Sequence, residues 1–212
     1  MRAMSDEGST GLGLSLPRPE DDGAADGLAG RAAPAIALES TTGERIDLAS
    51  IADGTLVVYV YPRTGIAGEP LPPGWRETPG AFGCTAENCA FRDHAGQLTA
   101  LGAKVLGVSA QPLHEQRDFA AREHMPYPLL NDSRLALADL LGLPVLEVAQ
   151  MRLYRRLTFI ARRGKIEKVF YPVFPPDEHP AEVIAWLAER IAPVPGAGAA
   201  GGPARGFGRT AC

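Results

Sequence analysis

Runs of apolar residues divide the chain into alternating strands and helices. The run at 56–61 is uninterrupted and rich in β-branched and aromatic residues, which is typical of a central strand buried on both faces. Weaker strand patterns and helical periods follow it in alternation, which predicts a mostly parallel sheet with helices on its faces. The expected strands are 104–109, 129–130, 153–161 and 165–171, the last two as an antiparallel hairpin, and the expected helices are 84–102, 113–124, 135–141 and 180–191.

The two ends of the chain lack such periods. Residues 1–30 are rich in Gly, Ser, Asp and Glu, and we expect a flexible segment there, extended or disordered. Residues 35–39 and 45–48 then predict a small hairpin. Residues 193–212 are mostly Gly, Ala and Pro and predict a disordered tail that ends in Cys212. The folded domain is therefore expected to span 31–192.

Composition excludes several classes of function. The chain has 212 residues, a formal net charge of −4 and a pI near 5.6, so it offers no basic surface for nucleic acid. No run approaches the roughly 18 apolar residues of a membrane span, and the first residues include acids and no signal-like apolar stretch. We expect a cytoplasmic protein without a nucleic-acid or membrane partner.

The three cysteines are the candidate chemistry. Their number is odd and too small for a secreted disulfide framework, so the close pair Cys84 and Cys89 points to catalysis or metal binding. Cys84 lies where a loop from the central strand enters a helix, and free backbone N–H groups and the helix dipole favour negative charge there. This position predicts a lowered thiol pKa and a nucleophile. The alternative for Cys89 is an inert buried cysteine.

The stretch 83–93 carries a longer motif, Gly-Cys-Thr-Ala-Glu-Asn-Cys-Ala-Phe-Arg-Asp. It resembles the peroxiredoxins of the type called peroxiredoxin Q or bacterioferritin comigratory protein, whose pattern is Gly-Cys-Thr-x-Glu-x-Cys-x-Phe-Arg-Asp. Further blocks keep that family's order, namely 33–38, 59–62, 105–109, 128–132 and 156–166. The resemblance implies an α/β, thioredoxin-like fold with an N-terminal hairpin and a mixed central sheet flanked by helices.

The resemblance also implies a thiol-dependent peroxidase that reduces hydrogen peroxide and organic hydroperoxides. Cys84 would be the peroxidatic residue that becomes a sulfenic acid, and Cys89 would resolve it as an intramolecular disulfide. Arg156 matches the family's arginine in Arg-x-[Ser/Thr]-Phe, and Glu87 would accept a hydrogen bond from it. The alternative for Glu87 is an acid that only complements the helix dipole in the first turn. On position alone Arg156 is instead a surface arginine among Arg152, Arg155, Arg162 and Arg163. The implied reductant is thioredoxin or a similar thiol donor. The implied oligomeric state is a monomer or a homodimer, and no cofactor or metal is expected.

The chain departs from the family pattern beside the nucleophile. The family has Thr or Ser three residues before it, where this chain has Ala81, and Thr78 looks like the displaced equivalent. Thr78 can reach Cys84 if the loop bulges; otherwise backbone N–H groups and Arg156 must hold the peroxide. About 15 extra residues separate Pro62 from Cys84 by comparison with the family. The resulting segment, 63–83, is rich in proline and glycine. We favour a loop packed on its own Trp75 over a cover for the peroxide pocket or a partner-docking surface.

Helix geometry limits how Cys84 and Cys89 can form a disulfide. Five residues of helix place their Cα atoms about 7.5 Å apart along the axis, beyond the usual limit of about 7 Å for a disulfide. The first turn of the helix must therefore unwind before the bond can form. Cys212 is interpreted as a bystander, and the alternative is that it acts as a second resolving cysteine.

The rival interpretation of the whole chain is a non-catalytic thioredoxin-fold binding module or a redox-regulated chaperone.

Overall fold

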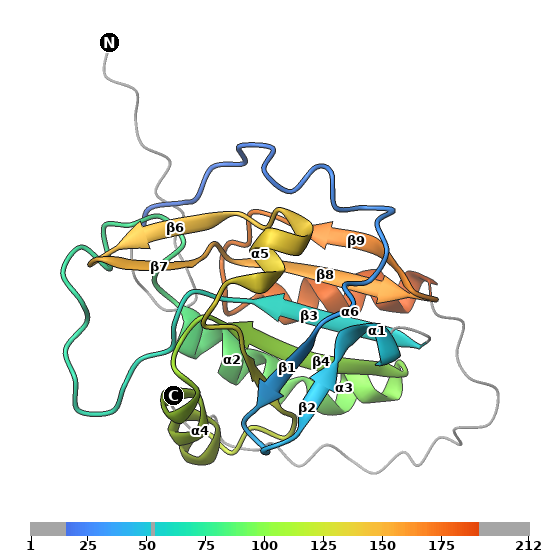
Figure 1. The fold of residues 1–212 in the computed structure, drawn as a ribbon, viewed down its shortest axis with the longest axis horizontal. Coiled ribbons are helices and arrows are strands. Elements are labelled where there is room, and N and C mark those ends of the chain that lie inside the picture. The colour runs from blue at the N-terminus through green and yellow to red at the C-terminus, as the bar shows by residue number, and fades with distance from the viewer. Residues whose placement is uncertain (1–15, 52–53, 191–212) are drawn as a thin grey trace.

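A seven-stranded mixed sheet forms the centre of the protein (Figure 1). The computed structural model describes residues 16–51 and 54–190. The strands lie in the order β2-β1-β5-β4-β3-β8-β9, and β6 and β7 form a separate two-stranded sheet. Their bounds are β1 Ala37–Ser40, β2 Arg45–Asp47, β3 Thr55–Val60, β4 Ala103–Ser109, β5 Leu129–Asn131, β6 Val145–Val148, β7 Met151–Tyr154, β8 Leu157–Arg162 and β9 Lys165–Phe170.

The predicted central strand is β3, which pairs on one side with β4 in parallel and on the other with β8 antiparallel. The mixed sheet and the N-terminal hairpin of β1 and β2 are confirmed. The expectation that most strands run parallel is wrong, since only β3–β4 and β4–β5 are parallel pairs in this sheet. Short turns join β1 to β2 and β8 to β9, which accounts for two of the four antiparallel pairs, because a short turn can only connect antiparallel neighbours.

Helices cover both faces of the sheet, so β3 is buried on both sides. Val57 and Tyr59 pack with apolar residues of α2, α3, α4 and α6, whereas Leu56 and Val58 pack with α5, α1 and the N-terminal segment. This division follows from the alternation of side chains along a strand. The helix bounds are α1 Leu48–Ile51, α2 Cys84–Asp93, α3 Ala95–Ala100, α4 Leu113–Arg122, α5 Ala136–Leu141 and α6 His179–Arg190.

The sequence did not predict the hairpin of β6 and β7. The expected strand 153–161 is in fact two strands, β7 and β8, that belong to different sheets. Tyr154 and Leu157 belong to the same buried cluster, although residues three apart on one continuous strand face opposite sides. The chain therefore bends at Arg155 and Arg156, and this bend turns the Arg156 side chain into the interior.

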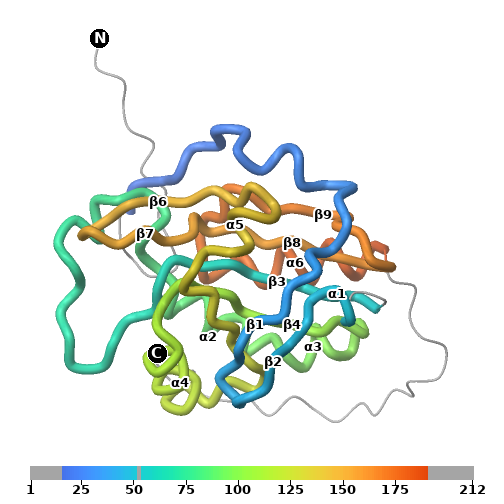
Figure 2. The backbone as a smooth tube through the Cα atoms, in the orientation of Figure 1, coloured from blue at the N-terminus to red at the C-terminus, as the bar shows by residue number. Residues whose placement is uncertain are grey.

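The N-terminal segment is ordered from residue 16 onward, where composition predicted extended or disordered chain. Figure 2 follows this segment, in blue, past β6 and β9 before it enters β1. Leu16, Ala25 and Leu28 are buried, and Gly30 N–H donates to the carbonyl of Ile166. Their apolar contacts fix a segment that has no regular secondary structure. Residues 1–15 and 191–212 lie outside the described residues, and with them the predicted tail and Cys212.

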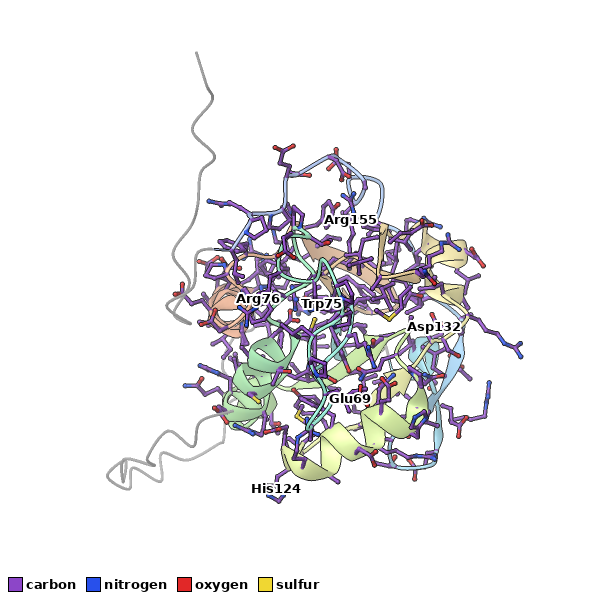
Figure 3. All side chains as sticks on the ribbon, turned by 90° about the vertical axis from the view of Figure 1, so that its left-hand side faces the viewer. Glu69, Trp75, Arg76, His124, Asp132 and Arg155 are labelled. Atoms are coloured by element: carbon purple, nitrogen blue, oxygen red, sulfur yellow. The ribbon has the colours of Figure 1, made fainter. Side chains whose placement is uncertain are left out.

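The long loop 63–83 projects beside the β6–β7 hairpin (Figure 1). Trp75, labelled in Figure 3, is 4% exposed and belongs to an apolar cluster with Ala81 of the loop and with Leu146 and Leu153 of the hairpin. This packing agrees with the favoured interpretation of the loop as a packed element, although most of the cluster comes from the unpredicted hairpin. The alternative roles as a pocket cover or docking surface remain predictions.

Candidate active site

Cys84 is the first residue of α2, as the sequence predicts. The preceding residue, Gly83, has a φ of 99°, in the left-handed region that favours glycine, and a Cβ there would overlap the ring of Pro176. Glu87 N–H donates to the Gly83 carbonyl at 2.9 Å and closes the first helical turn. Gly83 therefore fixes the approach of the chain and the place of the sulfur, which is 2% exposed.

Arg156 reaches this sulfur from the bend between β7 and β8. Its Nη2 lies 3.1 Å from Cys84 Sγ and also donates to the carbonyls of Phe82 (3.0 Å) and Gly80 (3.3 Å). Its Nη1 donates to the carboxylate of Glu87 in a buried ion pair. The structure thus brings together the three predicted residues Cys84, Arg156 and Glu87, and the interpretation of Arg156 as a surface arginine is wrong because it is 3% exposed.

Burial governs the ionisation of this cluster. It raises the pKa of Glu87, and the charge of Arg156 opposes that rise. One oxygen of Glu87, Oε1, has no hydrogen-bond partner among the described residues. Burial alone would lower the pKa of Arg156, but Cys84 and Glu87 raise it, so the guanidinium stays charged. Glu87 therefore holds a fixed cation beside the sulfur.

The pKa of Cys84 is raised, not lowered as its place at a helix start predicts. Burial is the largest cause. Arg156 lowers the pKa and Glu87 raises it further, so the cation offsets the burial only in part. The thiol also donates to the carbonyl of Ala81 at 3.4 Å, a contact that favours the protonated form. The sequence argument missed this result because the exposure of a side chain is set by the tertiary fold.

Thr78 lies on the wall of the site without contacting the sulfur in this conformation. Its hydroxyl donates to the carbonyl of Gly74 at 2.7 Å, so the group is directed into its own loop. Thr78 nevertheless lines two cavities together with Arg156. Ala81, at the position where relatives have Thr or Ser, is fully buried. A role for Thr78 in holding peroxide stays a prediction.

Cys89 lies on the same helix and is 5% exposed, with its Sγ 3.9 Å from Oε2 of Glu123. Cys84 is free, so the two residues are not joined in this conformation. The helix α2 is continuous from Cys84 to Asp93, which keeps the two sulfurs apart.

Asn88 and Tyr59 tether the first turn of α2, and sequence reasoning did not find this tether. Asn88 Nδ2 donates to the carbonyl of Cys84 at 2.8 Å, and the hydroxyl of Tyr59 donates to Asn88 Oδ1 at 2.8 Å. Thr85 Oγ1 accepts a bond from Gly65 N–H at 3.1 Å, which ties the turn to the long loop. Asn88 is fully buried and lies four residues after Cys84. A polar residue on the inner face of a helix was the available signal.

Two cavities meet Arg156. The smaller, about 10 Å³, is bounded by Phe82 and the 173–176 segment, and holds about one water-sized group. The larger, about 520 Å³, extends outward from Arg156 between the N-terminal segment, the loop and the β6 strand. Arg156 therefore contacts the buried sulfur and also lines a cavity with ample space.

The described residues contain no group of three His, Cys, Asp or Glu side chains that could hold a metal ion. Within the same residues, every helix is too short or too polar to cross a bilayer. The chemistry available to this site is that of a sulfur, a guanidinium and a carboxylate. These groups define a thiol-based redox protein on a thioredoxin-like sheet.

Comparison with known proteins identifies the family. The Redoxin family profile matches residues 28–184. Peroxiredoxin Bcp of Escherichia coli (strain K12) is 30% identical over 165 residues, which cover 76% of this chain and 96% of that protein. The chloroplastic Peroxiredoxin Q of Populus jackii is 27% identical over 158 residues, covering 74% of this chain and 67% of that protein. The crystal structure of Peroxidoxin BcpB from Mycobacterium tuberculosis superposes with a TM-score of 0.63 at 27% identity, covering 78% of this chain and 99% of that one.

The chain belongs to the Redoxin family, and within it to the peroxiredoxins of the Bcp and Q type. It is a thiol-dependent peroxidase whose substrates are peroxides and whose recycling uses a thiol reductant.

Proposed function

We propose that Cys84 is the peroxidatic residue of this peroxidase. Its thiolate attacks one oxygen of a hydroperoxide, the O–O bond breaks, and the other oxygen leaves as an alkoxide or hydroxide that takes up a proton. The sulfur is oxidised to a sulfenic acid and the peroxide is reduced to an alcohol or water. The observation that carries this proposal is the 3.1 Å contact between Arg156 Nη2 and Cys84 Sγ.

Arg156 serves both sides of this step. Its charge favours the thiolate over the thiol, and its N–H groups stabilise the negative charge that develops on the departing oxygen. The ion pair with Glu87 holds the guanidinium in place before substrate arrives. Incoming peroxide would compete for N–H groups that now contact the carbonyls of Gly80 and Phe82. Thr78, on the wall of the same cavities, is the proposed second contact for peroxide.

Cys89 is the proposed resolving residue. Its thiolate attacks the Cys84 sulfenic sulfur, a disulfide forms, and the hydroxyl leaves as water. The first turn of α2 has to unwind for this step, which breaks the bond from Asn88 to the Cys84 carbonyl and the contact of Thr85 with Gly65. A reduced thiol donor, for which thioredoxin is the expectation from relatives, then restores both cysteines. We further propose a cytoplasmic location and a monomeric or homodimeric state.

Hydrogen peroxide and organic hydroperoxides are the proposed substrates. The Bacterioferritin Comigratory Protein of Xanthomonas campestris, which has the same fold at 22% identity and a TM-score of 0.59, has alkyl peroxide reduction activity. The larger cavity beside Arg156 has space for an organic substituent, which supports the same class here.

Peroxide consumption by the purified chain with dithiothreitol tests the proposal. Wild-type protein is expected to consume hydrogen peroxide, and Cys84→Ser to lose all activity while keeping its fold by circular dichroism. Mass spectrometry after one equivalent of peroxide should show a Cys84–Cys89 disulfide. Activity retained by Cys84→Ser would refute the assignment, and a wild-type protein that consumes no peroxide would favour a non-catalytic binding module or a redox-regulated chaperone.

A further inference from the structure

The larger cavity beside Arg156 is far bigger than hydrogen peroxide requires. A water occupies about 30 Å³ in the liquid, and hydrogen peroxide has only one more heavy atom. The cavity of about 520 Å³ exceeds that need roughly tenfold, and ligand pockets for small organic molecules begin at about 300 Å³. Its inner end is Arg156, which contacts Cys84. The space therefore lies where the organic part of a bound hydroperoxide would extend.

One wall of this cavity comes from the N-terminal segment. We call residues 16–22 the strap; Arg18, Pro19, Glu20 and Asp22 of the strap line the cavity. The facing walls come from Thr78 and Pro79 of the long loop, and from Leu146 of β6. Apolar groups such as Pro19, Pro79 and Leu146 alternate with charged ones. Such a lining suits an amphipathic organic hydroperoxide.

A clamp of three side chains holds the strap in this position. The Asp22 carboxylate accepts hydrogen bonds from Tyr171 Oη (2.8 Å) and from Arg155 Nη1 (2.5 Å), and Arg155 also donates to Tyr171 Oη at 3.1 Å. The bond from Tyr171 holds the pKa of Asp22 below its usual range, so the carboxylate is charged at neutral pH. Figure 3 labels Arg155 beside the N-terminal segment. At the other end, Leu16 is buried and anchors the strap.

The clamp and the catalytic arginine are adjacent in sequence. Arg155 faces the strap and Arg156 faces Cys84, because the bend between β7 and β8 directs the two side chains to opposite sides. The wall of the cavity is thus fixed relative to the reacting sulfur through two consecutive residues. A loosened strap would move away from the body of an organic substrate without displacing Arg156.

We propose that the strap is a specificity element that binds the organic body of bulky hydroperoxides, with Asp22 as its positioning residue. This inference rests on the proposed peroxidase function of the same site. Leu16 and Pro17 of the strap also line the smaller cavity at Arg156, but Leu16 is anchored by its own burial and Asp22 lines only the larger cavity, so reduction of hydrogen peroxide does not depend on the clamp. Bulky hydroperoxides gain contacts with the strap, and their KM depends on it.

Asp22→Asn tests the inference, with Asp21→Asn as a matched control. Each aspartate accepts a hydrogen bond from the backbone N–H two residues later, but only Asp22 also binds Arg155 and Tyr171. Steady-state rates are measured for cumene hydroperoxide and for hydrogen peroxide, with dithiothreitol as reductant. In Asp22→Asn, KM for cumene hydroperoxide should rise about fivefold, a modest effect because the clamp is partly exposed. The kcat for both substrates, and KM for hydrogen peroxide, should not change.

Tyr171→Phe removes the second partner of Asp22 and should shift the same KM in the same direction. Equal changes for both peroxides, no change in either clamp variant, or the same change in Asp21→Asn would overturn the inference and leave the peroxidase assignment intact. A wild-type protein that reduces neither peroxide would overturn the proposed function, and the inference with it.

Discussion

Two positions of α2, its first residue Cys84 and the mid-helix residue Cys89, have different charged neighbours. Cys84 lies 3.1 Å from a buried guanidinium, whereas Cys89 lies 3.9 Å from the carboxylate of Glu123, which itself pairs with Arg92 and Arg122. The buried cation favours the thiolate form of Cys84. Under the proposed mechanism, Cys84 meets peroxide and Cys89 acts only after the helix opens, so the two positions serve different steps.

Cys89→Ser should produce the largest effect on sustained turnover while leaving the first step unchanged. Without a resolving thiol, the Cys84 sulfenic acid persists and is open to overoxidation. Rapid mixing with one equivalent of peroxide is expected to show wild-type loss of the Cys84 thiol. Assays with thioredoxin and its reductase should then show no continued turnover. Sustained thioredoxin-dependent turnover in this variant would mean that another residue resolves Cys84.

Arg156→Ala should slow the first step about a hundredfold or more, the usual loss for a charged transition-state donor. Burial already raises the pKa of Cys84, and removing the cation raises it further. Because only the thiolate reacts with peroxide, the rate rises as the pH passes the pKa of Cys84. In Arg156→Ala this rise in rate should occur at a higher pH than in the wild-type protein. Stopped-flow rates between pH 5 and 10 measure both effects. Arg152→Ala, an exposed residue of β7, is the control, and equal rates for the two variants would exclude a role for Arg156.

Asn88→Ala should have a smaller effect, and on the second step. It removes the bond to the Cys84 carbonyl and leaves the Tyr59 hydroxyl without its 2.8 Å partner, so the fold should lose about 1–3 kcal/mol. Disulfide formation should become a few times faster because the first turn opens more easily. Tyr59→Phe is the control, since it keeps the bond from Asn88 to Cys84. Mass spectrometry of quenched samples follows the disulfide, and a slower appearance in Asn88→Ala would contradict the tether.

Deletion of residues 196–212 is expected to have the smallest effect. Cys212 lies outside the described residues, and a cysteine at the end of a long flexible tether is expected to compete poorly with Cys89, which is on the same helix as Cys84. Steady-state turnover with thioredoxin should therefore match that of the full chain. A marked loss in a truncated protein that unfolds at the wild-type temperature would assign Cys212 a part in the cycle.

The sequence predicted the two charged residues that contact each other beside Cys84, but it did not predict the pKa of Cys84. Glu87 and Arg156 were found because each belongs to a motif, and they do form an ion pair. The pKa of Cys84 was predicted in the wrong direction because local helix geometry says nothing about how much of the sulfur the tertiary fold buries.

The strap and the β6–β7 hairpin were missed for a related reason. The strap has no periodic pattern, and its place depends on Tyr171 and Arg155, more than 130 residues away in the chain. The hairpin was missed because residues 153–161, which belong to β7 and β8, were interpreted as one β-rich strand. Only the shared cluster of Tyr154 and Leu157 reveals the bend between them.

The position of Trp75 gives the protein an optical reporter of its own redox state. The indole is 4% exposed and shares a cluster with Ala81 and Phe82, whose carbonyls contact Cys84 and Arg156. In the proposed cycle Cys84 leaves its place to bond with Cys89, so those carbonyls would lose their partners and the segment that packs on Trp75 would shift. Indole emission depends on its surroundings, so the intrinsic fluorescence of the unlabelled protein would follow oxidation and reduction in real time.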